Sequence, residues 1–265
     1  MIVRHNSVGR IVTIALGAYR ESVRERVLYN LVVFAFVMIG AAILMGNISV
    51  GVEQIILVNL GLTAISIFGL LIAIFIGIGL VSKEIESRTI YNILSKPVTR
   101  AEFIVGKYAG LLLTLVVNTA IMTGGFYLAL AIQNRGLKAH DLALLIPIYF
   151  ILLELAIVVG IAVLFSCISS SILSAVFTFC LFVIGNFSRD IGWFGRESNS
   201  PVLEKLTAAL YYLLPNFSNF NVIEQAAHRA SVPGWMITAN TCYALLYIAT
   251  LLAAAILIFE QREFK

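Results

Sequence analysis

The sequence predicts an all-α integral membrane protein, and its composition and the grouping of its apolar residues carry that prediction. Of 265 residues, 60% are hydrophobic and 12% are charged, whereas about a quarter of an ordinary soluble domain is charged. The apolar residues form six runs, each close to the roughly 20 residues that a helix needs to cross a bilayer. The six predicted transmembrane helices cover 27–45, 55–81, 103–132, 142–165, 172–187 and 236–259. We expect residues 1–265 to form a single transmembrane domain, in which 172–187 is the shortest span.

The residues before the first span have a pattern of their own. Val12, Leu16 and Tyr19 recur at spacings of four and three within 10–26, and arginine and glutamate crowd the later turns. Such an amphipathic helix is expected to lie in the membrane interface, with its apolar side towards lipid and its basic residues near anionic headgroups. The alternative is a simple helical extension of the first span into the cytoplasm.

The connection between the second and third spans holds the densest charge cluster of the chain. Within it, Ile85, Thr89 and Ile93 recur at intervals of four, which predicts a short amphipathic helix over 84–97. Pro97 ends this helix, because proline has no amide hydrogen and disfavours helix for the residue before it. We expect the helix to lie across the cytoplasmic ends of the two spans.

A helix start follows directly. Thr99 and Glu102 have the spacing of a capping box, in which each side chain accepts a hydrogen bond from a backbone amide of the other residue. The next helix is therefore expected to begin with a cap at Thr99.

The segment 188–235 is the longest connection, and we expect it outside the cell with two helical pieces. Pro201 fits a first helical position, and Pro215 ends the apolar stripe that follows it. Asn221 suits the cap of a second helix over 222–229. Aromatic residues are spread along the segment, as is typical of groups at a membrane interface.

Lysine and arginine predict the orientation. Twelve of them fall on the side of the amino terminus and six on the other side, and basic residues concentrate in cytoplasmic loops. We therefore expect both termini in the cytoplasm and the chain in the inner, or plasma, membrane. The net charge of +4 indicates no nucleic-acid partner, because the basic residues flank apolar spans and form no single patch.

One ionisable residue, Glu154, lies near the middle of a predicted span. A charged residue at the bilayer centre costs roughly 2.5–3.5 kcal/mol on insertion scales, so it must face protein or water. Two interpretations stay open. Glu154 is either a coupling-proton site or contact for polar or cationic cargo, or a protonated carboxyl group hydrogen-bonded across a helix interface.

Milder polar residues occur on the spans at helical spacing and could line a translocation path. Their commoner use is an interhelical hydrogen bond worth about 1 kcal/mol or less. Besides Glu154, the candidate path residues are Asn59, Thr63 and Ser66 in the second predicted span and Thr114 and Asn118 in the third.

The sequence lacks the usual motifs of catalysis. It has no G-x-x-x-x-G-K-[ST] phosphate loop, no H-E-x-x-H and no G-x-S-x-G, which are signatures of nucleotide, zinc and serine chemistry. Its three cysteines and three histidines have no metal-ligand spacing. We therefore expect no enzyme activity, no catalytic residue, no metal and no cofactor in this chain.

The stretch 84–107 resembles a run found in permease subunits of ABC exporters of the ABC-type-2 or ABCG-like class. The family's run has an acidic residue, Gly-Thr, a leucine-rich turn, Pro-Val-Ser/Thr-Arg and Gly-Lys, and here Arg88 stands where the glycine is usual. The resemblance implies that 84–97 is a coupling helix that docks on a separate ATPase subunit. The docking residues that it implies are Glu84, Ile85, Glu86, Arg88, Thr89, Ile93, Leu94, Pro97 and Arg100.

The resemblance also implies partners and a function. It implies a homodimer, or a heterodimer with a similar permease, in the lipid bilayer, together with two ATPase subunits that bind ATP and Mg on the cytoplasmic side. The implied function is ATP-driven export of a substrate whose identity stays open. A weaker similarity points to permeases linked to the maturation of multicopper enzymes, although no Met, His or Cys cluster here could carry copper.

Two other functions stay open from the sequence. One is a non-transporting subunit that relays ATPase motion to an external partner protein through 188–235. The other is an ion-coupled carrier that works through Glu154. The lack of an inverted repeat or of broken helices in the sequence argues against the carrier.

Overall fold

The computed structural model describes residues 7–48, 52–86, 99–136, 138–197, 202, 204–205, 207, 211 and 214–261. This part of the chain is helical and contains no strand, which confirms the all-α prediction. The helices are α1 (Ser7–Val23), α2 (Arg26–Ile48), α3 (Glu53–Glu86), α5 (Arg100–Gln133), η1 (Ala139–Leu144), α6 (Leu145–Ile168), α7 (Ser171–Asn186), α8 (Ser188–Glu197), η2 (Phe217–Asn219), α10 (Ile223–Ala227) and α11 (Gly234–Gln261).

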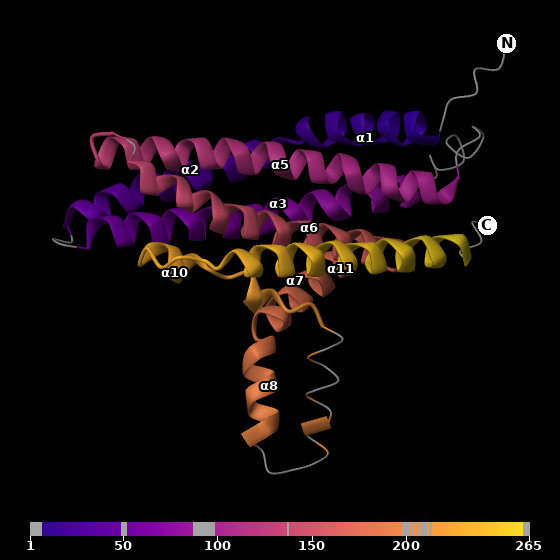
Figure 1. The fold of residues 1–265 in the computed structure, drawn as a ribbon. Helices are drawn as coiled ribbons and strands as arrows, with labels where there is room; N and C mark the ends of the chain where they lie inside the picture. The colour runs from indigo at the N-terminus through magenta and orange to yellow at the C-terminus, as the bar shows by residue number, and fades with distance from the viewer. Residues whose placement is uncertain are drawn as a thin grey trace.

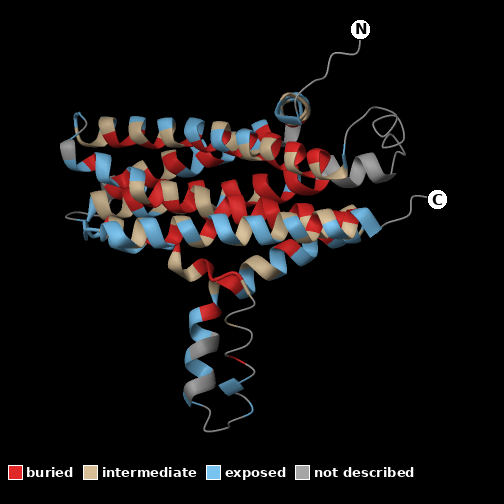
Figure 2. Cartoon of the chain, turned by 45° about the vertical axis from the view of Figure 1, so that its right-hand side comes forward, coloured by how far each residue is buried: buried red, intermediate tan, exposed pale blue. Residues whose placement is uncertain are grey.

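The long helices form one bundle. Figure 1 shows α2, α3, α5, α6 and α11 side by side, with both termini at the same end of the bundle. We call that end the proximal end, and the opposite end, where α10 lies, the distal end. The helix α6 contacts α3, α5, α7 and α11, and most of its side chains are buried. Figure 2 shows by colour that buried residues gather in the interior of the bundle. The helix α6 is therefore the centre of the core.

Five helices among the described residues are long and apolar enough to cross a membrane. They are Leu28–Gly46, Glu53–Ile78, Arg100–Gln133, His140–Ile168 and Gly234–Gln261. The predicted span 172–187 corresponds to α7, which has 16 residues and is about 24 Å long at 1.5 Å per residue. A hydrocarbon core is about 30 Å thick, so α7 is too short to cross it alone. Of the six predicted spans, five are single helices long enough to cross a membrane and the other, α7, is not.

The boundary before the charged connection differs from the prediction. The helix α3 continues to Glu86 and does not end at 81, so residues 84–86 belong to its last turn and do not start a separate helix. A helix that is already formed extends at little cost until a breaker stops it, and the first breaker in this stretch is Pro97. The remainder of the predicted helix, 87–98, lies outside the described residues.

The capping box at the start of α5 is confirmed. The Thr99 side chain accepts a hydrogen bond from the Glu102 amide at 3.2 Å, and the Thr99 amide donates to Glu102 Oε2 at 3.0 Å. The helix therefore begins at Arg100, three residues before the predicted span 103–132.

The helix α1 is separate from α2 and packs across α5. It ends at Val23 and a turn follows it, so a continuous extension of the first span is wrong. Figure 2 shows the helix next to the amino terminus end-on, whereas the bundle helices are seen from the side. Glycines permit this oblique contact: a Cβ on Gly106 would lie 2.8 Å from Ile14, and a Cβ on Gly110 would lie 2.6 Å from the Ala18 Cβ.

The predicted apolar stripe of α1 faces away from α5. Val12 and Leu16 are exposed, as is Val8 in the first turn, while Ala18 on the other side is buried. An exposed apolar face beside an apolar bundle is what an interfacial helix presents to lipid. The observed bounds replace the predicted 10–26, and the position of α1 in a membrane interface stays a prediction.

The helix α7 carries the chain only halfway along the bundle. Figures 1 and 2 both show α8 leaving the bundle sideways near its middle. The chain then returns, and Phe217 and Phe220 are fully buried, with their rings against Phe182 of α7 and Phe150 of α6. It continues to α10 at the distal end, so α7 and the returning segment 214–232 together complete one crossing.

The helices of 188–235 differ in part from the prediction. The helix α8 is not predicted from the sequence, and its ten residues include two glycines, a residue that disfavours helix. Residues 202, 204–205, 207 and 211 are helical, in line with the helix predicted after Pro201. The second predicted helix, 222–229, is the shorter α10, and its cap residue is Val222.

Candidate functional site

Glu154 is buried against the end of α7. It lies in α6 and is 5% exposed, and the side chain of Asn186, the last residue of α7, is its polar neighbour. Asn186 Nδ2 itself donates to the Phe182 carbonyl oxygen of its own helix at 3.1 Å. The contact between Glu154 and Asn186 joins two helices inside one copy of the chain. This arrangement fits a carboxyl group held across a helix interface, the second of the two interpretations of Glu154.

A polar cluster lies beside this contact, where the chain leaves and re-enters the bundle. Ser188 and Ser218 each donate a hydrogen bond to Asn216 Oδ1, at 2.8 and 2.6 Å. Asn216 donates from Nδ2 to the Tyr211 hydroxyl and from its backbone amide to the Tyr243 hydroxyl, both at 2.9 Å. We call these five residues the Asn216 cluster. It joins the start of α8, the returning segment and α11.

The Asn216 cluster explains how irregular backbone is tolerated midway along the bundle. In hydrocarbon, non-helical backbone occurs only where protein buries it or where it lines water. Asn216 is 6% exposed, and both ends of its side chain and its backbone amide are hydrogen-bonded. Gly185 allows the close approach, because a Cβ there would lie 2.5 Å from the Pro215 carbonyl oxygen. The cluster is therefore a rigid joint between α7, α8 and α11.

Among the described residues, no group of His, Cys, Asp and Glu could hold a metal ion.

The candidate path residues of α3 face out of the bundle. Asn59 is exposed, and Thr63 and Ser66 are half-buried. A single copy of the chain leaves this polar face uncovered. Glu154 lies elsewhere, in the contact between α6 and α7, so one copy does not bring these residues together in a single track.

The candidate path residues of α5 bind their own helix. Thr114 Oγ1 donates to the Gly110 carbonyl oxygen at 3.0 Å, and Asn118 Nδ2 donates to the Thr114 carbonyl oxygen at 2.8 Å. Both side chains are buried. Within one copy they satisfy helix carbonyls and do not border an open path.

Arg100 is the docking candidate whose side chain the structure describes. Its Nη1 donates to the carbonyl oxygens of Phe259 and Glu260 at 2.7 and 2.9 Å, and its guanidinium lies 5.8 Å from the centre of the Phe259 ring. A cation at the carboxyl end of a helix is favourable, so Arg100 braces α5 against α11. Of the other docking candidates, Glu84, Ile85 and Glu86 lie in the last turn of α3, and Arg88, Thr89, Ile93, Leu94 and Pro97 lie outside the described residues.

Two ion pairs that the sequence pattern alone does not predict join α1 to the start of α5. Arg10 Nη2 lies 2.9 Å from Glu102 Oε1, and Lys107 Nζ lies 3.6 Å from Glu21 Oε2. Lys107 is only 4% exposed, so its charge is matched inside a mostly apolar contact. A signal was present, because Arg10 and Glu21 are eleven residues apart and so share one face of a helix.

The structure thus combines span-length apolar helices, a charged connection between two of them and a short helix braced against the proximal end. A family model described as ABC-2 family transporter protein matches residues 12–264. A search of the curated proteins finds no match. The chain therefore belongs to the ABC-2 family of transporter proteins and is a permease subunit of an ABC transporter, a multi-pass membrane component that normally works with an ABC ATPase subunit.

Proposed function

We propose that this permease is an exporter subunit, driven by ATP hydrolysis in two separate ATPase subunits that dock on residues 84–100 at its proximal end. In this proposal ATP and Mg bind to the ATPase subunits, and the chain itself is not an enzyme. The proximal end faces the cytoplasm from the inner or plasma membrane, because lysine and arginine are concentrated on that side.

The observation that carries the proposal is the anchoring of the charged connection at both ends. The helix α3 runs unbroken to Glu86, and α5 starts from the capped Thr99. The twelve residues 87–98 therefore join two helices that are each long enough to cross the membrane, so a partner that pushes on the connection moves both. Arg100 and the two ion pairs of α1 extend this linkage to α11 and α1.

The residue types of the connection suit a docking surface. Ile85, Ile93 and Leu94 are apolar and would fill a groove on the ATPase subunit, as buried apolar groups do at the centre of interfaces. The charges of Glu84, Glu86 and Arg88 would select the partner, because complementary charges favour the right partner and repel wrong ones.

We also propose that two copies, or this chain and a similar permease, form the path between them. The outward polar face of α3 supports this. Ser66 lies thirteen residues into α3, about 20 Å from its start at 1.5 Å per residue, where lipid offers no hydrogen bond. A second permease would cover Asn59, Thr63 and Ser66 and make them one wall of the path.

The position of α8 supports the same assembly. It leaves the bundle midway, with Asp190 and Glu197 exposed. Exposed carboxylates at that depth are costly in lipid, whereas a neighbouring permease or a water-filled path accommodates them.

The test of the docking proposal is co-purification with the ATPase encoded beside this chain, together with the ATPase activity of the complex. We expect Glu84→Arg combined with Ile93→Asp to lose the ATPase, while size-exclusion chromatography shows an intact protein. The matched control is Glu53→Arg, which reverses a charge at the distal end of the same helix and should bind normally. If the double variant binds as well as the wild type, the docking proposal is wrong.

A further inference from the structure

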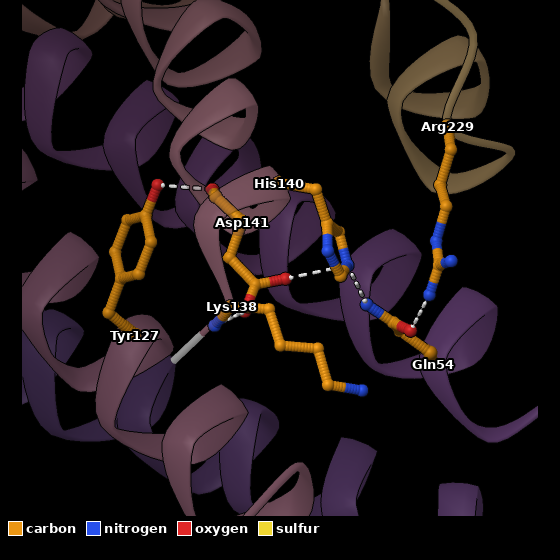
Figure 3. Close-up of polar contacts among 6 residues, drawn as sticks. All are labelled: Gln54, Tyr127, Lys138, His140, Asp141 and Arg229. Carbon is orange, nitrogen blue, oxygen red and sulfur yellow. Dashed lines mark hydrogen bonds and ion pairs between the residues drawn. The ribbon is translucent and has the colours of Figure 1, made fainter. Parts of the chain in front are cut away.

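The distal end carries a cavity bordered by a row of polar side chains. The cavity has a volume of about 270 Å³ and lies between the start of α3, η1 with the first turn of α6, and the end of α10. Its lining is mostly apolar, but four polar residues of the lining form the row that Figure 3 shows. They are, in order, Asp141, His140, Gln54 and Arg229.

Each residue of the row contacts the next. Asp141 Oδ1 lies 3.2 Å from His140 Nε2, and the same Nε2 lies 3.4 Å from Gln54 Nε2. Gln54 Oε1 in turn accepts a hydrogen bond from Arg229 Nη2. The row therefore links η1, α3 and the end of α10, which are far apart in the sequence.

His140 Nε2 cannot hydrogen-bond both of its neighbours in the row at once, because one contact needs the nitrogen to accept and the other needs it to donate. Arginine has donors and no acceptor, so Gln54 must turn its oxygen to Arg229 and its N–H group to His140. His140 Nε2 must then be unprotonated to accept that hydrogen bond. Asp141 Oδ1 makes the opposite demand, because an oxygen acceptor needs a proton on the nitrogen that faces it.

Asp141 is the residue whose Oδ1 is left without a donor when His140 is neutral with its proton on Nδ1, the tautomer in which Nε2 accepts from Gln54. Asp141 is 1% exposed, and its Oδ1 then accepts no hydrogen bond in the described structure, whereas its Oδ2 accepts one from the Lys138 amide at 2.9 Å. A buried polar atom without a partner is unfavourable. When His140 is protonated, its Nε2–H group forms an ion pair with Asp141 Oδ1. The same Nε2–H group then faces the N–H group of Gln54, and two donors cannot hydrogen-bond each other.

The backbone conformation of Arg229 is a second, independent observation in favour of a role for this row. Arg229 directly follows His228, the C-cap of α10, and has φ 57°, in the left-handed region where glycine is usual. The amides of Arg229 and Ala230 close the turn on the carbonyl oxygens of Ala226 and Gln225 at 3.0 and 2.8 Å. An arginine is strained there relative to glycine, and its hydrogen bond to Gln54 is the contact that a glycine could not make.

We propose that this row is a proton-controlled latch on the distal cavity. With His140 neutral, Gln54 bridges His140 and Arg229 and holds the end of α10 over the cavity. With His140 protonated, the imidazolium pairs with Asp141 and Nε2 no longer accepts from Gln54. The Gln54 amide then turns its oxygen towards the imidazolium and its N–H group towards Arg229, which has only donors, so Arg229 is released. Histidine is the side chain that changes charge between pH 5 and 8, and the His140 side chain is 42% exposed to water. Acidification therefore opens the latch.

The other groups around the row leave this assignment intact. Tyr127 of α5 donates to the Asp141 backbone oxygen at 3.0 Å, so it contacts no atom that changes charge. His228 Nδ1 lies 3.0 Å from the Glu224 carbonyl oxygen of its own helix. Glu53, beside Gln54, is exposed. Lys138, just before η1, is exposed and contacts Asp141 through its backbone amide. Among these described neighbours, Asp141 is the acid in contact with His140.

The test is hydrogen–deuterium exchange of the full chain in nanodiscs at pH 7.5 and pH 5.5, corrected for the intrinsic pH dependence of amide exchange. The readout is the segment 223–232, with 244–253 of α11 as the reference. Loss of one hydrogen bond to a charged group is worth about a tenfold change in an opening equilibrium. We therefore expect about tenfold faster corrected exchange of 223–232 at pH 5.5 and no change in the reference.

Three variants separate the latch from other effects of acid. His140→Gln cannot be protonated, so the exchange of 223–232 should be the same at both pH values. Arg229→Gly relieves the backbone strain and removes the latch, so the exchange should be fast at both. His228→Gln is the matched control on α10 and should respond as the wild type does. The proposal is overturned if the wild type shows no response, if His140→Gln still responds, or if His228→Gln abolishes the response.

Discussion

Burial decides what Glu154 can do. The side chain is 5% exposed in the middle of α6, and Asn186 is its neighbour. A charged carboxylate without a cation is very costly in such surroundings, whereas a neutral carboxyl group both donates and accepts hydrogen bonds. The amide of Asn186 matches either role. We therefore infer that Glu154 helps to hold α6 to the end of α7.

Two variants of Glu154 test this inference. Glu154→Gln keeps a donor and an acceptor at the same place, so stability and ATPase activity of the complex should stay close to wild type. Glu154→Leu removes the polar contact with Asn186, which is half-buried and also donates to the Phe182 carbonyl oxygen, and should lower the stability of the folded state by about 1 kcal/mol. Unfolding in denaturing detergent, followed by tryptophan fluorescence, measures the difference. Complete loss of ATP-driven activity in a normally stable Glu154→Gln would instead favour a proton-coupling role.

At the scale of elements, the packing of α1 on α5 is the contact that most directly links the amino-terminal region to the spans. Gly106 and Gly110 let the helices approach, and the ion pairs of Arg10 and Lys107 fix their register. The contact lies next to the proposed docking stretch. A displacement of α5 therefore carries α1 with it.

A larger residue at Gly110 is expected to separate the two helices. A leucine there would place its Cβ against Ala18 and the Ala15 carbonyl oxygen, so α1 must move away. Gly124→Leu is the matched control in the same helix, because a Cβ there meets nothing within 4 Å. Trypsin should cleave after Arg20 or Arg24 faster in Gly110→Leu than in wild type or control. Equal cleavage of the three proteins would show that α1 is not held by this contact.

Elements whose cause is local could be predicted from the sequence, and those whose cause is distant could not. Thr99 and Glu102 are three residues apart, so their reciprocal hydrogen bonds are visible in the sequence. The sequence also predicts the apolar helix over 172–187, but it does not predict that α7 stops halfway along the bundle. That depends on Asn216, 28 residues after Ser188, and on Tyr243 in another helix. The extension of α3 to Glu86 was missed because a charged sequence can continue a helix as well as start one.

At the scale of the whole molecule, a single copy leaves polar groups of α3 on the outer surface of a membrane bundle. The candidate path residues were chosen by helical spacing, which shows that residues share a face but not what that face meets. The structure gives Asn59, Thr63 and Ser66 an outward face, Thr114 and Asn118 hydrogen bonds to their own helix, and Glu154 a place in the core. In the proposed assembly, a second permease would place another wall opposite the α3 residues.

Disulfide cross-linking tests that assembly. In a background with Cys167, Cys180 and Cys242 replaced by serine, Asn59→Cys should give a cross-linked dimer in native membranes after oxidation. Leu246→Cys is the control, because Leu246 is 69% exposed but lies on α11. Cross-linking through Leu246→Cys and none through Asn59→Cys would place the contact between permeases on the opposite helix and contradict the proposed path.

The halfway stop of α7 also bears on how the protein is made. The crossing that α7 begins is completed by residues 214–232, and its joint is closed by the hydroxyl of Tyr243 in α11. Those groups are synthesised after α7, and a 16-residue helix is too short to settle across the membrane alone. The crossing that α7 begins therefore reaches its final form only after synthesis of α11, and a chain cut short before α11 has no means of completing it.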